Sequence, residues 1–275
     1  MHYPLSCVKI FSVIDTNIPI EKKIFFLSPH AVVREIIVDL IAEGYEVYVI
    51  DDRNILLKLL ELFPDSIVFI NFDIDMEHKW DVYLRKILNT HTIKNIRVGI
   101  FTFYKFKKEK FANYYIGEVG IQCGFIELHI EKNKCKELLL LILELNEAKG
   151  RRKYIRAIYD GKANFNLKYK NKLYTGAIKD ISVAGMACFI SLAEELLLQG
   201  QQLDDIQLIL RGIRCRVTGK LLTVRKYNDR DCYIIMFDAD RMDIDLKNKI
   251  NRCVFLQIQE TMKKIIQSAG ALKND

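Results

Sequence analysis

The arginine-rich stretch at residues 151–156 contains the residue types that most directly suggest binding chemistry. Arg152 and Arg156 form an R-x-x-x-R pattern, and Arg151 directly precedes it. A guanidinium group is a planar fork of N–H donors that fits phosphate oxygens and the O6/N7 edge of guanine, and its flat face also stacks on a base. These arginines are therefore candidates for holding a phosphorylated, guanine-bearing ligand; the alternative is a solvated basic linker.

A second motif, D-x-S-x-x-G, ends a predicted strand at residues 180–185. The carboxylate of Asp180 can accept hydrogen bonds from N1 and N2 of guanine, and the hydroxyl of Ser182 can donate to a phosphate. Gly185 lets the backbone approach a ligand closely because it has no Cβ. The alternative is that Asp180 only caps a turn.

The segment between the two motifs predicts how they are brought together. Ala163, Phe165, Leu167 and Tyr169 alternate with polar residues, which is typical of a half-buried strand. On a small antiparallel barrel, the start of one strand and the end of the next can be neighbours. We therefore expect the arginines and the Asp180 turn to form one pocket.

The two motifs in this order, separated by alternating strands, resemble the signature of the PilZ domain family of bacterial cyclic di-GMP receptors. The resemblance covers roughly residues 150–267. It implies that the arginines of the first motif hold guanine and phosphates and that the second motif completes the pocket. The matching positions are Arg152, Arg156, Asp180, Ser182 and Gly185.

The residue before the first motif bears on ligand stoichiometry. In PilZ proteins that resemble this chain, a basic residue at the position of Arg151 goes with capture of an intercalated cyclic di-GMP dimer. Two stacked molecules bring their phosphodiester charges together, and an extra guanidinium offsets the repulsion. We expect this ligand form and no separate cofactor.

The rest of the C-terminal half predicts a six-stranded antiparallel β-barrel with a C-terminal helix. Strands are expected at about residues 157–169, 173–182, 185–191, 206–210, 214–226 and 232–238, with a helical turn at 192–198. Several strands without long helices between them are typical of a closed barrel. Apolar residues at helical spacing indicate a helix over 243–266, packed on the barrel or on another subunit.

The N-terminal half predicts an α/β fold. Strands are expected at residues 24–27, 46–50, 66–72, 97–103 and 124–128, with helices at 31–43, 54–62, 80–88, 106–119 and 134–145. Short apolar strands that alternate with helices favour a parallel sheet covered on both faces. The layout resembles the receiver domain of two-component signalling, with its flavodoxin-like strand order.

These patterns divide the chain into four parts. We expect a leader, a degenerate receiver-like domain, a linker that carries the R-x-x-x-R motif, and the PilZ-type barrel with its helix. Their respective bounds are residues 1–20, 21–146, 147–156 and 157–275.

The receiver-like half lacks the residues that phosphorylation requires. Residues 28–30 are Ser-Pro-His where a receiver has its acidic pair, and the third strand ends near Asn71, with Asp73 two positions further in a loop predicted to be solvated. Thr102 matches the receiver hydroxyl position, but residues 127–129 contain no lysine. Without a carboxylate cluster, nothing binds Mg²⁺ or accepts a phosphoryl group. We interpret this half as a contact surface for a partner or a second copy.

Charge and composition favour an anionic ligand of the C-terminal half. The net charge is +7; residues 151–275 contain 23 basic and 14 acidic residues, whereas residues 1–150 contain 19 and 21. Seven scattered cysteines without a C-x-x-C pair argue against a disulfide framework or zinc site and favour a reducing cytoplasm. The histidines, including His30, lie outside metal-ligand spacing, so surface or capping roles are expected and no metal. We find no signal peptide and no membrane span.

The sequence thus predicts a cytoplasmic, non-enzymatic cyclic di-GMP receptor that signals to a protein partner by changing interdomain geometry. The family analogy implies bacterial motility or surface behaviour as the output, with flagellar or signalling machinery as a possible partner. Two alternatives stay open: a phosphorylatable response regulator with a barrel output, and a basic nucleic-acid-binding protein. The second is disfavoured because its stacking platforms would need exposed aromatic side chains, and the candidates Phe165, Tyr169 and Phe237 alternate as core residues do.

Overall fold

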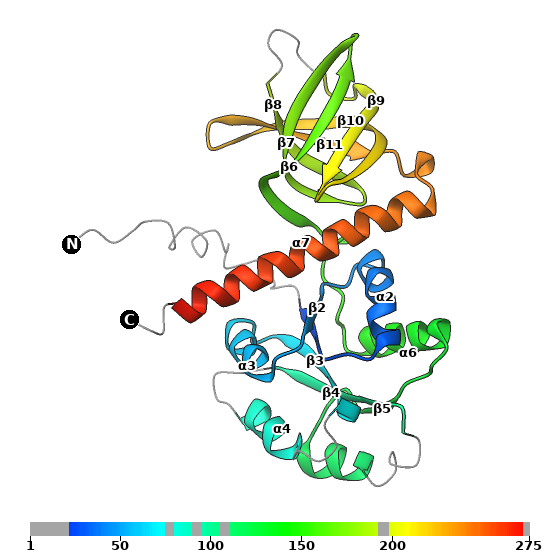
Figure 1. Cartoon of the computed structure of the whole chain (residues 1–275), viewed down its shortest axis with the longest axis vertical. Helices are drawn as coiled ribbons and strands as arrows, with labels where there is room; N and C mark the ends of the chain where they lie inside the picture. The colour runs from blue at the N-terminus through cyan, green and yellow to red at the C-terminus, as the bar shows by residue number, and fades with distance from the viewer. Residues whose placement is uncertain (1–21, 75–79, 90–94, 105–110, 192–197, 272–275) are drawn as a thin grey trace, which may run out of the picture.

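The N-terminal half of the chain is a parallel sheet with helices packed around it (Figure 1). The structure, a computed structural model, describes residues 22–74, 80–89, 95–104, 111–191 and 198–271. The strands are β1 (Lys23–Leu27), β2 (Val47–Ile50), β3 (Ser66–Asn71), β4 (Arg97–Thr102) and β5 (Phe125–Glu127). Their order is β2-β1-β3-β4-β5, which is the flavodoxin-like arrangement predicted from the sequence.

The helices of this half include α2 (Ala31–Ala42), α3 (Arg53–Leu62), α4 (Trp80–Asn89) and α6 (Lys132–Leu145), with a short 3-10 helix η1 (Phe72–Ile74) after β3. The central strands are continuous apolar runs because both faces of the sheet are covered: all six residues of β3 are buried. The helix predicted at 106–119 is seen from residue 111, and its end is a π-helix, η2 (Tyr114–Val119).

The C-terminal half is a closed antiparallel barrel. Its strands are β6 (Ala157–Tyr169), β7 (Lys172–Ser182), β8 (Gly185–Ile190), β9 (Gln202–Leu210), β10 (Ile213–Tyr227) and β11 (Arg230–Phe237). The closed order is β10-β11-β8-β7-β6-β9. Strand β9 begins four positions earlier than predicted, and the predicted helical turn at 192–198 lies mostly outside the described residues.

Alternation along the barrel strands separates core from surface as predicted. Ala163, Phe165 and Leu167 are buried, whereas Asn164 and Lys168 are exposed. The predicted hairpin turn at 228–229 also forms, with φ of +47° and +62° at its two residues, values that Asn and Asp tolerate better than most residues.

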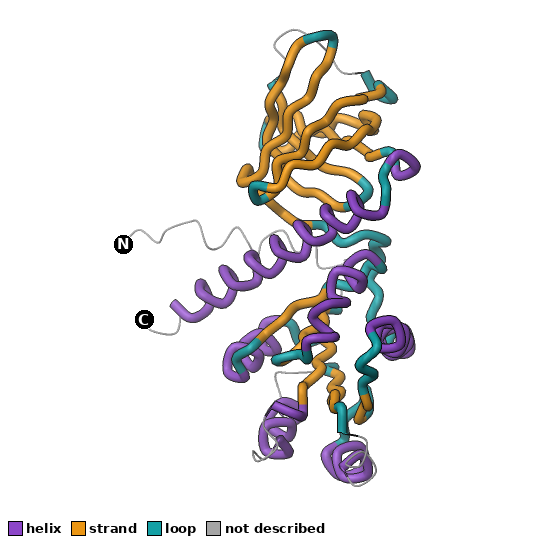
Figure 2. Tube along the Cα trace, turned by 45° about the vertical axis from the view of Figure 1, so that its right-hand side comes forward, coloured by secondary structure: helices purple, strands orange, loops and turns teal. Residues whose placement is uncertain are grey.

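The C-terminal helix α7 (Ile244–Ala271) crosses between the barrel and the parallel sheet (Figures 1 and 2). On the barrel side, Gln257 donates from Nε2 to Ile158 O at 2.9 Å, and the Tyr159 hydroxyl donates to Cys253 O at 3.2 Å. On the sheet side, Gln259 bonds the backbone of Val49 in β2. The sequence predicted packing on the barrel but not this second contact.

Among the described residues, no helix combines the length and apolar character needed to cross a bilayer.

Candidate functional site

The pairing of β6 with β7 brings the two sequence motifs together. Ala157 pairs with Ile181 and Ile158 with Asp180, so Arg156, one position before β6, lies beside the end of β7. Its Nη1 atom is 3.7 Å from Oδ1 of Asp180. The side chain of Arg156 is 54% exposed and that of Asp180 only 16%. Because the Arg156 side chain is largely in contact with water, the ion pair contributes little stability.

A β-bulge determines which way Asp180 faces. Ile178 pairs with Cys188 and Asp180 with Ala187, so Lys179 is an extra residue in β7. Strict alternation would place Asp180 on the same side as the buried Ile178. The bulge shifts the alternation by one position, so Ile181 is buried and Asp180 faces outward.

The remaining residues of the second motif hold the β7–β8 turn. Ser182 is 4% exposed; its Oγ accepts from Ala184 N at 3.3 Å and donates to Gly185 O at 3.5 Å. A Cβ on Gly185 would lie 2.3 Å from Ile235 O, so glycine is required for the close approach of β8 and β11. Both residues thus have structural roles in the turn, in addition to the ligand contacts predicted for them.

Arg151 and Arg152 lie in the exposed linker before β6. Arg156 forms an ion pair with Asp180. The ligand roles of the six motif residues (Arg151, Arg152, Arg156, Asp180, Ser182 and Gly185) stay predictions.

The linker packs against the turn between α2 and β2. A Cβ on Gly44 would lie 2.6 Å from Lys153 O, the carbonyl between the two arginines of the motif. Lys149 Nζ lies 5.8 Å from the centre of the Tyr45 ring, and Ile155 is buried. The backbone that carries the arginines is therefore in direct contact with the α/β half.

A second polar cluster lies at the carboxyl edge of the parallel sheet. Thr102 Oγ1 donates to Asp73 Oδ1 at 2.6 Å, and Phe103 N donates to Asp73 Oδ2 at 2.8 Å. His30 Nε2 lies 3.2 Å from the same Oδ2 without hydrogen-bond geometry. Burial lowers the pKa of His30, and the Asp73 carboxylate partly offsets that effect.

This cluster corrects two expectations. Asp73 was predicted to lie in a solvated loop, but its side chain is only 10% exposed. His30 was predicted to have a surface or capping role; it occupies the N-cap position of α2 without a side-chain cap hydrogen bond, and at 12% exposure its side chain does not lie on the surface. The short helix η1 turns Asp73 back over the sheet toward Thr102, which spacing along the sequence could not show. In the described part of the chain, no three potential metal-binding side chains gather here or elsewhere.

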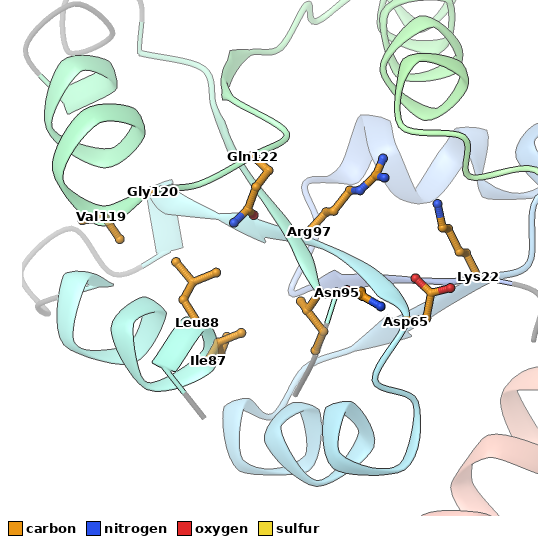
Figure 3. Close-up of a pocket in the computed structure, with 10 residues that line it drawn as sticks. Lys22, Asp65, Ile87, Leu88, Asn95, Arg97, Val119, Gly120 and Gln122 are labelled. Atoms are coloured by element: carbon orange, nitrogen blue, oxygen red, sulfur yellow. The ribbon is translucent and has the colours of Figure 1, made fainter. Parts of the chain in front are cut away.

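A cavity of about 630 Å³ lies at the opposite, amino edge of the parallel sheet (Figure 3). Two of its basic side chains bind the C-cap of α6: Arg97 Nη1 and Lys22 Nζ donate to Asn146 O at 2.8 and 3.4 Å. Cations at a helix C-terminus stabilise the helix. None of its lining residues belongs to either motif, and parallel α/β sheets bind ligands at the other edge.

The C-terminal half matches a known protein family. Residues 150–256 match the PilZ domain family, and no curated protein matches the chain. Among solved structures, the chain is similar to the PilZ domain of YcgR from Escherichia coli with c-di-GMP (16% identity, TM-score 0.37), covering 42% of this chain and 97% of that one.

Two further structures show a similarity of the same extent. They are the K. pneumonia MrkH–c-di-GMP complex (21% identity, TM-score 0.36, 42% of this chain and 55% of that one) and the inhibitor of motility MotI/DgrA from Bacillus subtilis (15% identity, TM-score 0.32, 42% and 52%). The matched part of this chain spans about half the length of these two proteins. By its family match, the segment 150–256 is a PilZ domain.

Proposed function

We propose that this protein is a non-enzymatic receptor for cyclic di-GMP. The observation that carries the proposal is the approach of Arg156 to Asp180 within a PilZ domain. A guanidinium and a carboxylate 3.7 Å apart offer complementary groups to the two edges of a guanine, and the adjacent arginines supply positive charge for phosphates.

Ligand binding would be coupled to the α/β half through the linker. Arg151, Arg152 and Arg156 flank Lys153, whose carbonyl rests against Gly44. Drawing the guanidinium groups onto the ligand displaces this backbone, and the α2–β2 turn must follow or separate from it. The free energy with which the ligand can shift the chain from one arrangement to the other is limited to the difference between its binding free energies for the two arrangements.

The receiver-like half would then present the signal to a protein partner. Helix α6 exposes two leucines, Leu141 at 54% and Leu145 at 73%, which is the kind of surface a partner covers. Location in the bacterial cytoplasm and an output in motility or surface behaviour are parts of this proposal that rest on family analogy.

Isothermal titration of the full chain with cyclic di-GMP tests the proposal. We expect saturable binding by the wild type and a loss of at least roughly tenfold in affinity for Arg156→Ala, because a hydrogen bond to a charged group contributes about 1.5–3 kcal/mol. Arg214→Ala, which removes an exposed arginine of β10, is the matched control and should bind normally. Absence of binding by the wild type would refute the proposal.

The same titration tests the ligand form. If an intercalated dimer binds, the wild type should take up two molecules of cyclic di-GMP per chain. The Arg151→Ala variant should lose the second molecule first. A stoichiometry of one for the wild type would show that only a single molecule is captured.

A further inference from the structure

Next to the Arg156–Asp180 pair, the outer face of the barrel carries alternating aromatic and basic side chains. Lys179 Nζ lies 3.9 Å from the centre of the Tyr227 ring. The Tyr227 and Phe189 rings are 6.1 Å apart between centroids, and Arg230 Cζ lies 4.7 Å from the centre of the Phe189 ring. We call these four residues the outer platform.

The strand pairing explains why residues distant in sequence share this face. Phe189 pairs with Ala177 across β7 and β8, and Tyr227 pairs with Arg230 at the β10–β11 turn. Their neighbours Ile178 and Cys188 point into the barrel and are fully buried. Because side chains alternate along a strand, Phe189 faces outward.

The outer platform is continuous with the predicted binding pair. Lys179 Nζ is 3.9 Å from Oδ2 of Asp180, whose Oδ1 is 3.7 Å from Arg156. The Cys232 thiol lies close to the same two residues. Burial raises the pKa of this thiol most, while Lys179 lowers it and Asp180 raises it by smaller amounts. A continuous series of contacts therefore connects Arg156, through Asp180 and the outer platform, to Arg230.

The aromatic and basic side chains of the outer platform are suited to binding a second nucleobase rather than a protein side chain. Tyr227 is 46% exposed, so much of its surface is open to solvent. Flat aromatic faces bind any nucleobase by stacking, and nearby cations attract phosphate. The Lys179 ammonium, at the end of a flexible stem, can turn toward a phosphate and leave the Tyr227 ring to the base.

We propose that the outer platform is a stacking subsite for a guanine of the ligand other than the one at the Arg156–Asp180 pair. Tyr227 and Phe189 provide the stacking surface, and Lys179 and Arg230 bind the phosphates between the bases. The inference rests on the proposed cyclic di-GMP receptor function and adds residues that neither motif includes.

Titration of three full-length variants with cyclic di-GMP tests the subsite. Tyr227→Leu keeps apolar bulk but removes the aromatic face, and we expect roughly tenfold weaker binding. Tyr227→Phe keeps the face and should bind as the wild type does. Lys179→Met should also weaken binding, whereas Lys168→Met, which removes an exposed lysine of β6, should not.

The outcomes separate this inference from the receptor function. If Arg156→Ala loses affinity while Tyr227→Leu and Lys179→Met bind normally, the subsite is refuted and the receptor function stands. If the wild type does not bind, both are refuted. Thermal unfolding of each variant separates a loss of affinity from a loss of fold: a purely structural Lys179–Tyr227 contact would lower the melting temperature and leave the affinity of the folded protein unchanged.

Discussion

The side-chain amide of Gln259 forms a pair of hydrogen bonds with the backbone of Val49. Val49 N donates to Oε1 at 2.9 Å, and Nε2 donates to Val49 O at 3.0 Å. Val49 belongs to β2, the edge strand of the parallel sheet, so the amide satisfies backbone groups that a further strand would otherwise bond. Helix α7, which packs on the PilZ barrel, thereby also bonds the backbone of the edge strand of the α/β sheet.

Replacing this amide should weaken the contact between the two halves. In Gln259→Leu, the Val49 N–H and C=O lose their partners, and we expect a loss of about 1–3 kcal/mol in the free energy of unfolding. Urea unfolding measures the loss, and hydrogen exchange at the Val49 amide should accelerate. Gln267→Leu, an exposed glutamine of the same helix, is the control; equal stability of the two variants would contradict this role.

Gly44 should be required for the linker to rest on the α/β half. Its φ is +89° and its Cβ position lies 2.6 Å from Lys153 O, so Gly44→Ala meets both backbone strain and a clash. We expect a larger loss of stability than the roughly 1–2 kcal/mol of left-handed strain alone. Differential scanning calorimetry measures the change.

Gly120→Ala is the matched control for that experiment. Gly120 has a similar φ of +85° but nothing within 4 Å of its Cβ position. The difference between the two variants therefore isolates the contact with Lys153. If both variants lose the same stability, the linker does not depend on this contact.

The burial of His30 should make stability depend on pH. Its pKa in the folded protein is below the ordinary value of 6.5 because burial disfavours the charged form, and Asp73 only partly offsets this. Between the two values the unfolded chain binds more protons, so the free energy of unfolding should fall as pH decreases from 6.5 toward the folded pKa. Chemical denaturation across this window should show the slope, and His30→Phe should reduce it.

Asp73 should not accept phosphate. Its carboxylate already accepts hydrogen bonds from Thr102 Oγ1 and Phe103 N, and the described residues hold no carboxylate cluster for Mg²⁺ around it. Incubation with a small phosphodonor and Mg²⁺ should leave the wild type unlabelled. Labelling that disappears in Asp73→Asn would instead support the response-regulator alternative.

The sequence by itself determined the two architectures and the motif pairing. Continuous apolar strands between helices indicated a parallel sheet, and alternation through Phe165 and Leu167 indicated barrel strands, because these patterns follow directly from which faces are buried. The expectation that Arg156 meets Asp180 also held, since adjacent antiparallel strands force the start of one beside the end of the next.

Only the tertiary structure decided in which direction the key side chains point and how the two halves of the chain contact each other. The bulge at Lys179 turns Asp180 outward, the short helix after β3 brings Asp73 to Thr102, and α7 reaches Val49. The platform of Tyr227 and Phe189 likewise depends on strand register. Local sequence patterns could not predict these features. Each feature depends on a contact between segments that are distant in the sequence, and the periodicity of apolar residues within one segment does not show which other segment it contacts.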